Sequence, residues 1–365
     1  MNFVPIAYYT NIYYQFLLVI TLFVLFQGGL KLESSRNLES KKALGFFIFI
    51  LILFYIGLRP LSYRFGDMVI YERQFQTYVS GAPMKVERDF VFEYFKYFMA
   101  KTTSAPVFFF FCTVFYVVPL YFAAKNFFKS YWFYGFFMLV ISFSFWSYGT
   151  NGLRNGIASS FFLYGLSKDK KIVILSLLFL STLIHKSMLL PFFGYIASLI
   201  YGNSKAYFLL WIACIPLSLA AGGFFTNFFM GLGVVEESAV SSYLGEFDQA
   251  AEGVDLKIGF RWDFLLYSFM GVFAGWYFVV VKKYQDKIYL QLLNVFLFSN
   301  AFWVLVIKAN YSNRFAYLSW FMLGVIIIYP LLKNKFFDNQ HAVVTRVILA
   351  YFVFTYVMNV FIYKV

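Results

Sequence analysis

Cationic and titratable side chains interrupt apolar stretches of this sequence at two places. Arg154 begins one apolar run, within TNGLRNGIASSFF, and His185-Lys186-Ser187 separates two others, within STLIHKSMLLPFF. An Arg or Lys at the centre of a membrane helix costs roughly 2.5–3.5 kcal/mol on insertion scales. An Arg at a helix N-terminus adds forked donors to free backbone N–H groups, which favours phosphate binding. An imidazole, an ammonium and a hydroxyl in one bend favour phosphate binding with proton transfer.

Polar residues of similar character occur in three further stretches, RFGDMVIYERQF, DFVFEYF and NRFAYLSW. They are Arg64, Asp67, Tyr71, Glu93 and Arg314. Arg314 precedes an apolar run shortly after an Asn, which is the placement of Arg154. Each feature also has a structural interpretation: a snorkelling anchor for an Arg, a polar turn at His185, or ion-paired surface groups.

The composition determines which elements must position these residues. The 365 residues are 62% hydrophobic, 25% aromatic and 13% charged, with a mean hydropathy of +0.72, which excludes an ordinary soluble protein. The net charge of +13 then reflects cytoplasmic loops and an anionic ligand, and no nucleic acid is predicted. Cys112 and Cys214 lie in apolar runs and are expected to be buried, without a disulfide.

Apolar runs of helical length predict an all-α polytopic membrane helix bundle of about 10–12 spans, forming a single domain over 1–365. The runs are 12–30, 43–60, 105–124, 131–149, 152–167, 172–184, 188–201, 206–225, 262–281, 288–307, 315–332 and 343–363. Two longer segments, 59–104 and 226–261, interrupt them. Both are rich in Tyr and Phe, so we expect a folded cap rather than disorder.

The loop charges indicate the orientation. Lys and Arg divide almost evenly between the two faces, whereas Asp and Glu concentrate on the face that carries the long segments. We therefore expect the N-terminus and both long segments to face outward. Arg64, Arg154, Lys186 and Arg314 then share that face, and a membrane-bound anion with more than one phosphate explains them. His341, in KFFDNQHAVV, is expected to be solvated in a cytoplasmic loop.

Several kinds of chemistry have no motif here. The sequence contains no P-loop, no HExxH, no paired-cysteine motif and no GxSxG elbow. No metal site and no cofactor are predicted.

The order of these residues resembles the EpsG family of Wzy-like polysaccharide polymerases over about 44–330. The first block is Arg64-Phe65-Gly66-Asp67 with Tyr71 and Phe75, followed by FEYF. The middle block is NGLRNGIASSFFLYGLSKDKKIVILSLLFLSTLIHKS, and the last is NRFAYLSW.

The resemblance implies a GT-C-like glycosyltransferase of the bacterial inner (cytoplasmic) membrane, independent of metal and nucleotide sugar. A growing glycan on undecaprenyl diphosphate would be transferred to the next lipid-linked repeat unit at the outer face. Membrane lipid and a chain-length regulator are the further partners expected.

The roles implied by the resemblance follow from a lipid diphosphate leaving group. Arg154 and Arg314 would stabilise its developing charge, with Lys186 in support. His185 would take the proton of the attacking hydroxyl, with Asp67 or Glu93 as alternatives. The other expected substrate contacts are Arg64, Asp67, Tyr71, Glu93, Ser187 and Tyr243. An O-antigen ligase, a lipid-linked oligosaccharide flippase and a membrane O-acyltransferase remain as other functions.

Overall fold

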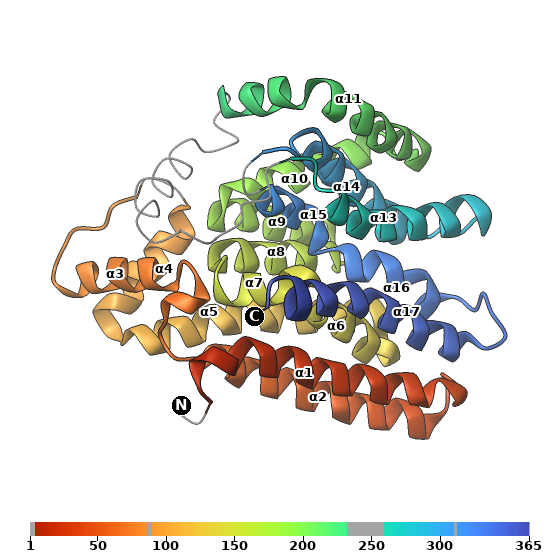
Figure 1. Cartoon of the computed structure of the whole chain (residues 1–365), viewed down its shortest axis with the longest axis horizontal. Coiled ribbons are helices and arrows are strands. Elements are labelled where there is room, and N and C mark those ends of the chain that lie inside the picture. The colour runs from red at the N-terminus through yellow and green to blue at the C-terminus, as the bar shows by residue number, and fades with distance from the viewer. Residues whose placement is uncertain (1–3, 87–88, 232–258, 310–311, 365) are drawn as a thin grey trace. The chain divides into compact units, whose positions relative to one another are not determined.

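The computed structural model describes residues 4–86, 89–231, 259–309 and 312–364 (Figure 1). Throughout these residues the regular structure is helical, and no strand occurs in them. The helices are α1 (Ile6–Phe26), α2 (Ser35–Gly57), α3 (Met68–Val79), α4 (Phe90–Thr102), α5 (Ala105–Phe128), α6 (Trp132–Val140), α7 (Phe143–Thr150), α8 (Leu153–Leu166), α9 (Lys171–Ile184), α10 (Leu189–Ile200), α11 (Ser204–Gly231), α13 (Trp262–Trp276), α14 (Lys287–Leu305), α15 (Asn313–Trp320), α16 (Leu323–Lys333) and α17 (Gln340–Tyr356).

The described residues include eight helical segments that are long and apolar enough to cross a membrane, which confirms a polytopic membrane helix bundle. They are Ile6–Gly29, Leu38–Gly57, Ala105–Val140, Ser204–Phe225, Trp262–Val281, Lys287–Leu305, Asn313–Lys333 and Gln340–Ile362. Two shorter apolar helices, Lys171–Ile184 and Lys186–Ile200, flank His185. The predicted run 131–149 is not one helix, because it breaks between α6 and α7 at Ile141 and Ser142.

The chain divides into two compact units, and the single-domain organisation stays a prediction. The first unit comprises residues 1–192 and 321–365, and the second comprises residues 193–320. In the first unit α8 packs between α5 and α9, while α6 packs against α16. In the second unit α11 packs on α14, where Asn300 bonds to Trp211 and to two serine hydroxyls.

The predicted loop 59–104 contains two helices, α3 and α4, which pack against each other. On α3 the side chains of Tyr71, Phe75 and Tyr78 are buried, while the residues between them are largely exposed. This amphipathic spacing explains why a segment with many charges still folds. Most of the other predicted loop, 226–261, lies outside the described residues, and so does Tyr243.

The structure tests two predictions about burial, one for the two cysteines and one for His341. Cys112 and Cys214 are both free and buried, as predicted. The expectation that His341 is solvated is wrong, because α17 begins at Gln340 and places the ring in the packed interior. Its Nε2 lies 2.7 Å from the Tyr134 hydroxyl, and its Nδ1 lies 2.9 Å from the Leu30 carbonyl oxygen.

Candidate active site

The turn between α7 and α8 presents Arg154. Helix α7 ends at Thr150, and α8 begins at Leu153, so Arg154 lies in the first turn of α8. The two helices approach so closely that a Cβ on Gly156 would lie 2.6 Å from the Tyr148 carbonyl oxygen. Only glycine therefore fits at this crossing without moving α8 and its arginine.

His185 reaches the same end of the bundle because α8 and α9 form a helical hairpin. The two helices pack together and are joined by a short turn, so the start of α8 lies near the end of α9. His185 follows α9 in an extended conformation, and the 3₁₀ turn Lys186–Met188 leads into α10. The Ser187 hydroxyl donates to the Asn155 side-chain oxygen of α8 at 2.9 Å, which ties the two ends together.

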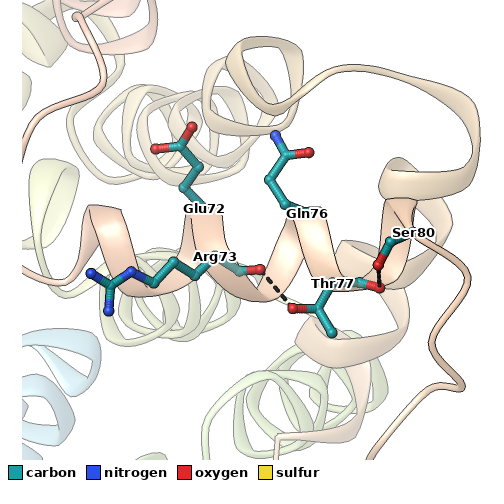
Figure 2. A pocket seen from close by; sticks show the side chains of 5 residues that line it. All are labelled: Glu72, Arg73, Gln76, Thr77 and Ser80. Carbon is teal, nitrogen blue, oxygen red and sulfur yellow. Dashed lines mark hydrogen bonds between the residues drawn. The ribbon is translucent and has the colours of Figure 1, made fainter.

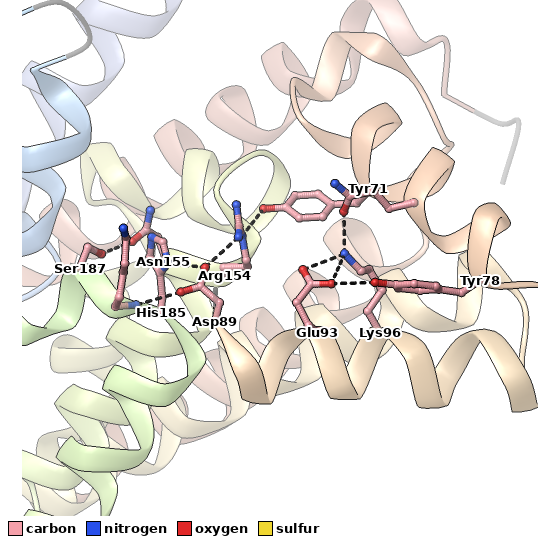
Figure 3. Close-up of polar contacts among 11 residues, drawn as sticks. Tyr71, Tyr78, Asp89, Glu93, Lys96, Arg154, Asn155, His185 and Ser187 are labelled. Atoms are coloured by element: carbon pink, nitrogen blue, oxygen red, sulfur yellow. Dashed lines mark hydrogen bonds and ion pairs between the residues drawn. The ribbon is translucent and has the colours of Figure 1, made fainter. Parts of the chain in front are cut away.

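Asp89, which precedes α4, joins these two ends, and sequence reasoning did not select it. Its Oδ2 accepts from Nη1 of Arg154 at 2.7 Å and lies 2.8 Å from Nδ1 of His185, while its Oδ1 accepts from the Lys186 backbone N–H at 3.0 Å (Figure 3). The Asp89 side chain is only 1% exposed. These four groups are called the Asp89 cluster below.

The charges of the Asp89 cluster determine where the protons lie. Burial raises the pKa of Asp89, but the hydrogen bond and charge of His185, the charge of Arg154 and the Lys186 N–H together outweigh it and lower that pKa from 3.8 to about 2. An ionised carboxylate can only accept hydrogen bonds, so Nδ1 of His185 carries the shared proton. In the neutral imidazole Nε2 is then the unprotonated nitrogen.

Arg154 also contacts Tyr71, and its Nη2 atom is not used by these contacts. Its Nε donates to the Tyr71 hydroxyl at 3.1 Å, and its guanidinium carbon lies 5.7 Å from the centre of that ring. Among the described residues, Nη2 has no hydrogen-bond partner, and the side chain is 33% exposed. The guanidinium is therefore held in place by two protein contacts while Nη2 remains available to a ligand.

A second polar cluster lies beside Tyr71 within α3 and α4 (Figure 3). Nζ of the buried Lys96 lies 2.8 Å from Glu93 Oε2 and 2.6 Å from Gln74 Oε1. The Tyr78 hydroxyl donates to the same Glu93 carboxylate at 3.3 Å. Glu93, predicted as a substrate contact or alternative base, is thus occupied by protein groups. Burial lowers the pKa of Lys96, although Glu93 opposes that effect.

The other predicted site residues are only partly brought together. The Asp67 N–H donates to the Asn151 side-chain oxygen at 2.8 Å, which docks the start of α3 beside the turn before Arg154. Arg64 is exposed in the adjoining 3₁₀ turn Tyr63–Phe65. Arg314 lies on α15 in the second unit, so its expected meeting with Arg154 stays a prediction. The described residues include no group of three His, Cys, Asp or Glu side chains able to hold a metal ion.

Comparison with known proteins gives one match. A family model described as the EpsG family matches residues 42–364, which is nearly the whole chain and includes the complete Asp89 cluster. No curated protein and no solved structure matches the chain.

Proposed function

The chain belongs to the EpsG family of membrane polysaccharide polymerases, and from that premise we propose its reaction. It transfers a growing glycan from undecaprenyl diphosphate to the next lipid-linked repeat unit, at the outer face of the bacterial inner membrane. The enzyme is a Wzy-type glycosyltransferase that needs neither metal nor nucleotide sugar. The observation that supports this proposal best is the Asp89 cluster, which unites an anion-binding guanidinium with an oriented imidazole.

In the proposed step, a hydroxyl oxygen of the acceptor sugar attacks the anomeric carbon of the donor glycan. The bond from that carbon to the phosphate oxygen breaks, and its electron pair leaves with the lipid diphosphate. The hydroxyl proton passes to Nε2 of His185. General base catalysis of this kind contributes typically 10²–10⁴-fold to a rate.

Asp89 prepares His185 for this role by accepting a hydrogen bond from its Nδ1–H group. The same carboxylate stabilises the imidazolium that forms when Nε2 takes the second proton. Glu93 is a weaker candidate for the base, because Lys96 and Tyr78 already bond to its carboxylate. Asp67 contributes its backbone N–H to the turn before α8, which fits a structural role.

Arg154 provides the fixed positive charge for the leaving diphosphate. One preorganised donor to a developing oxyanion is worth roughly 2.7–4 kcal/mol in comparable sites. Nη2 offers that donor, while Asp89 and Tyr71 hold the guanidinium. We propose that Arg314, Lys186, Arg64, Ser187 and Tyr243 make the further contacts with diphosphate and sugar, and that a chain-length regulator binds alongside.

Deletion of the gene, followed by analysis of lipid-linked sugars, tests the proposal. We expect long chains to disappear while single lipid-linked repeats accumulate at the outer face. Repeats trapped at the inner face would instead indicate a flippase, and long lipid-linked chains without transfer to a lipid A core would indicate a ligase. Intact chains lacking only acyl groups would indicate an O-acyltransferase.

Complementation of the deletion strain assigns the base. His185→Gln keeps a polar side chain of similar size but cannot take a proton, so it should not restore long chains. Lys168→Gln is the matched control, since Lys168 lies in the turn at the other end of the α8–α9 hairpin and should restore them. Long polymer from the His185→Gln strain, at wild-type protein abundance, would contradict the base assignment.

A further inference from the structure

Helix α4 exposes a row of aromatic rings. Phe90, Tyr94 and Phe98 are each 55% exposed, and their spacing of four residues places them on one face of the helix. The Phe90 and Tyr94 rings stack with their centroids 6.3 Å apart. The opposite face carries Phe92 and Lys96, which are buried. Helices α3 and α4 together are called the cap below. The three exposed rings are called the aromatic row below.

The neighbouring helix α3 exposes a mainly polar face, on which Ile70 and Val79 are the exposed large apolar residues. An open surface hollow of about 510 Å³ on this face is lined by polar side chains (Figure 2). The lining residues are Glu72, Arg73, Gln76, Thr77 and Ser80. Since α3 and α4 belong to the same cap and pack together, the aromatic row is not a general property of the cap surface. Water suits the exposed face of α3, whereas an apolar phase suits that of α4.

The position of α4 indicates which apolar phase this is. Helix α4 ends at Thr102, directly before the candidate membrane span Ala105–Val140. The Phe95 ring contacts the Phe108 and Phe115 rings of that span, with centroids 5.5 and 5.3 Å apart. Residues 105 to 115 of a helix cover about 15 Å. Helix α4 therefore runs beside the first turns of a spanning segment.

The aromatic row also continues an apolar stripe of that span. Helix α5 exposes Val107, Phe111, Phe115 and Phe122, which recur at helical spacing on one side. A spanning helix presents such a stripe to lipid. Phe95 lies next to the aromatic row on α4 and contacts Phe115 of this stripe. The exposed faces of α4 and α5 thus form one continuous apolar surface.

We propose that the aromatic row inserts into the phospholipid bilayer at the boundary between headgroups and acyl chains, so that α4 is an interfacial helix. Tyr and Phe suit this layer because their rings are largely apolar and the Tyr hydroxyl remains hydrated. Asp89 immediately precedes Phe90, so the insertion holds the Asp89 cluster at the depth of lipid phosphates. This last consequence rests on the proposed function, whereas the lipid contact does not.

Spin labelling of the full-length protein in nanodiscs of phosphatidylethanolamine and phosphatidylglycerol tests the insertion. A nitroxide is attached to Tyr94→Cys or Phe98→Cys, with Gln76→Cys on the polar face of α3 as the matched control. The native cysteines are buried, and the unsubstituted protein shows whether they react. Power saturation then compares the collisions of each label with oxygen, which concentrates in lipid, and with a nickel chelate, which stays in water.

We expect oxygen collisions to dominate at positions 94 and 98 and nickel collisions at position 76. Nickel access at 94 and 98 equal to that at 76 would overturn the proposal and favour a water-facing role such as sugar stacking. Labels at 94 and 98 that neither reagent reaches would also overturn it, because protein would then cover the row. If the labels at 94 and 98 contact lipid but the unsubstituted protein has no polymerase activity, the insertion stands and only the proposed function is rejected.

Discussion

Replacing Asp89 by Asn probes the Asp89 cluster with the smallest change of shape. The carboxylate uses one oxygen for Arg154 and His185 and the other for the Lys186 N–H. An amide has a single oxygen and a donor NH₂ group, so it cannot accept at both positions. If its oxygen remains with Lys186, its NH₂ faces Nδ1 of His185, favours the opposite tautomer and places the proton on Nε2. Asp89→Asn should therefore abolish polymer formation.

The expected loss of stability follows from the pKa of Asp89. A carboxyl whose pKa falls from 3.8 to about 2 on folding stabilises the folded state. The amount is at most about 2–3 kcal/mol, because each pKa unit corresponds to ~1.4 kcal/mol and part of the shift comes from the charge of His185. This contribution is fully present above pH 3.8 and is lost as the pH falls through about 2. The melting temperature of Asp89→Asn should thus be lower, on the order of 5 °C, at neutral pH.

Two measurements on the purified protein check this prediction. Thermal unfolding at several pH values should give a lower melting temperature for Asp89→Asn than for wild type, and this difference should shrink in strong acid. A polymerisation assay at a temperature where both proteins are folded separates lost activity from lost stability. An Asp89→Asn protein with wild-type melting temperature and wild-type chain length would refute the reasoning.

Four other substitutions give distinct outcomes. Arg154→Lys should lose nearly all polymer at normal membrane abundance, because an ammonium cannot hold the contacts of a planar guanidinium, and a gel with an immunoblot measures both. Arg314→Ala should match Arg154→Ala on the same gel; wild-type chain length would exclude a shared diphosphate. Tyr71→Phe removes one hydrogen bond to the charged guanidinium of Arg154, worth about 1.5–3 kcal/mol, so its initial rate should fall by roughly 10- to 150-fold. Lys96→Met leaves the largely buried Glu93 carboxylate without its ion-pair partner and should lower the melting temperature and protein abundance, as fluorescence-detected size exclusion would show.

The sequence was sufficient for the class of fold because the evidence is distributed over the whole chain. Long apolar helices follow from bilayer thickness and need no tertiary information. Arg154 and His185 were also identifiable, since a charge or an imidazole within an apolar stretch is unusual and therefore informative. The charged turn LSKDKK separates the two apolar runs that form α8 and α9.

The identity of the carboxylate was not accessible in the same way. Asp89 lies 65 residues from Arg154 and 96 residues from His185, so no local spacing connects them. DFVFEYF offers both Asp89 and Glu93. Glu93 pairs with Lys96 three residues along the same helix, whereas only the fold brings Asp89 to Arg154 and His185. The prediction that His341 is solvated was wrong for a related reason. A short polar stretch before a helix does not reveal that the ring is covered by other helices.

The shared carboxylate gives the Asp89 cluster a charge that changes in step with the proposed reaction. Before transfer, the charges of Asp89 and Arg154 balance and His185 is neutral in the proposed mechanism, so the cluster attracts the bound diphosphate only weakly. When the hydroxyl proton reaches Nε2, the cluster gains one positive charge as the leaving diphosphate gains one negative charge. The attraction is therefore stronger in the transition state than in the substrate complex, which is the condition for acceleration. Without Asp89, Arg154 would bind the diphosphate tightly in both the substrate complex and the transition state. The negative charge of Asp89 weakens binding in the substrate complex and so makes the attraction selective for the transition state.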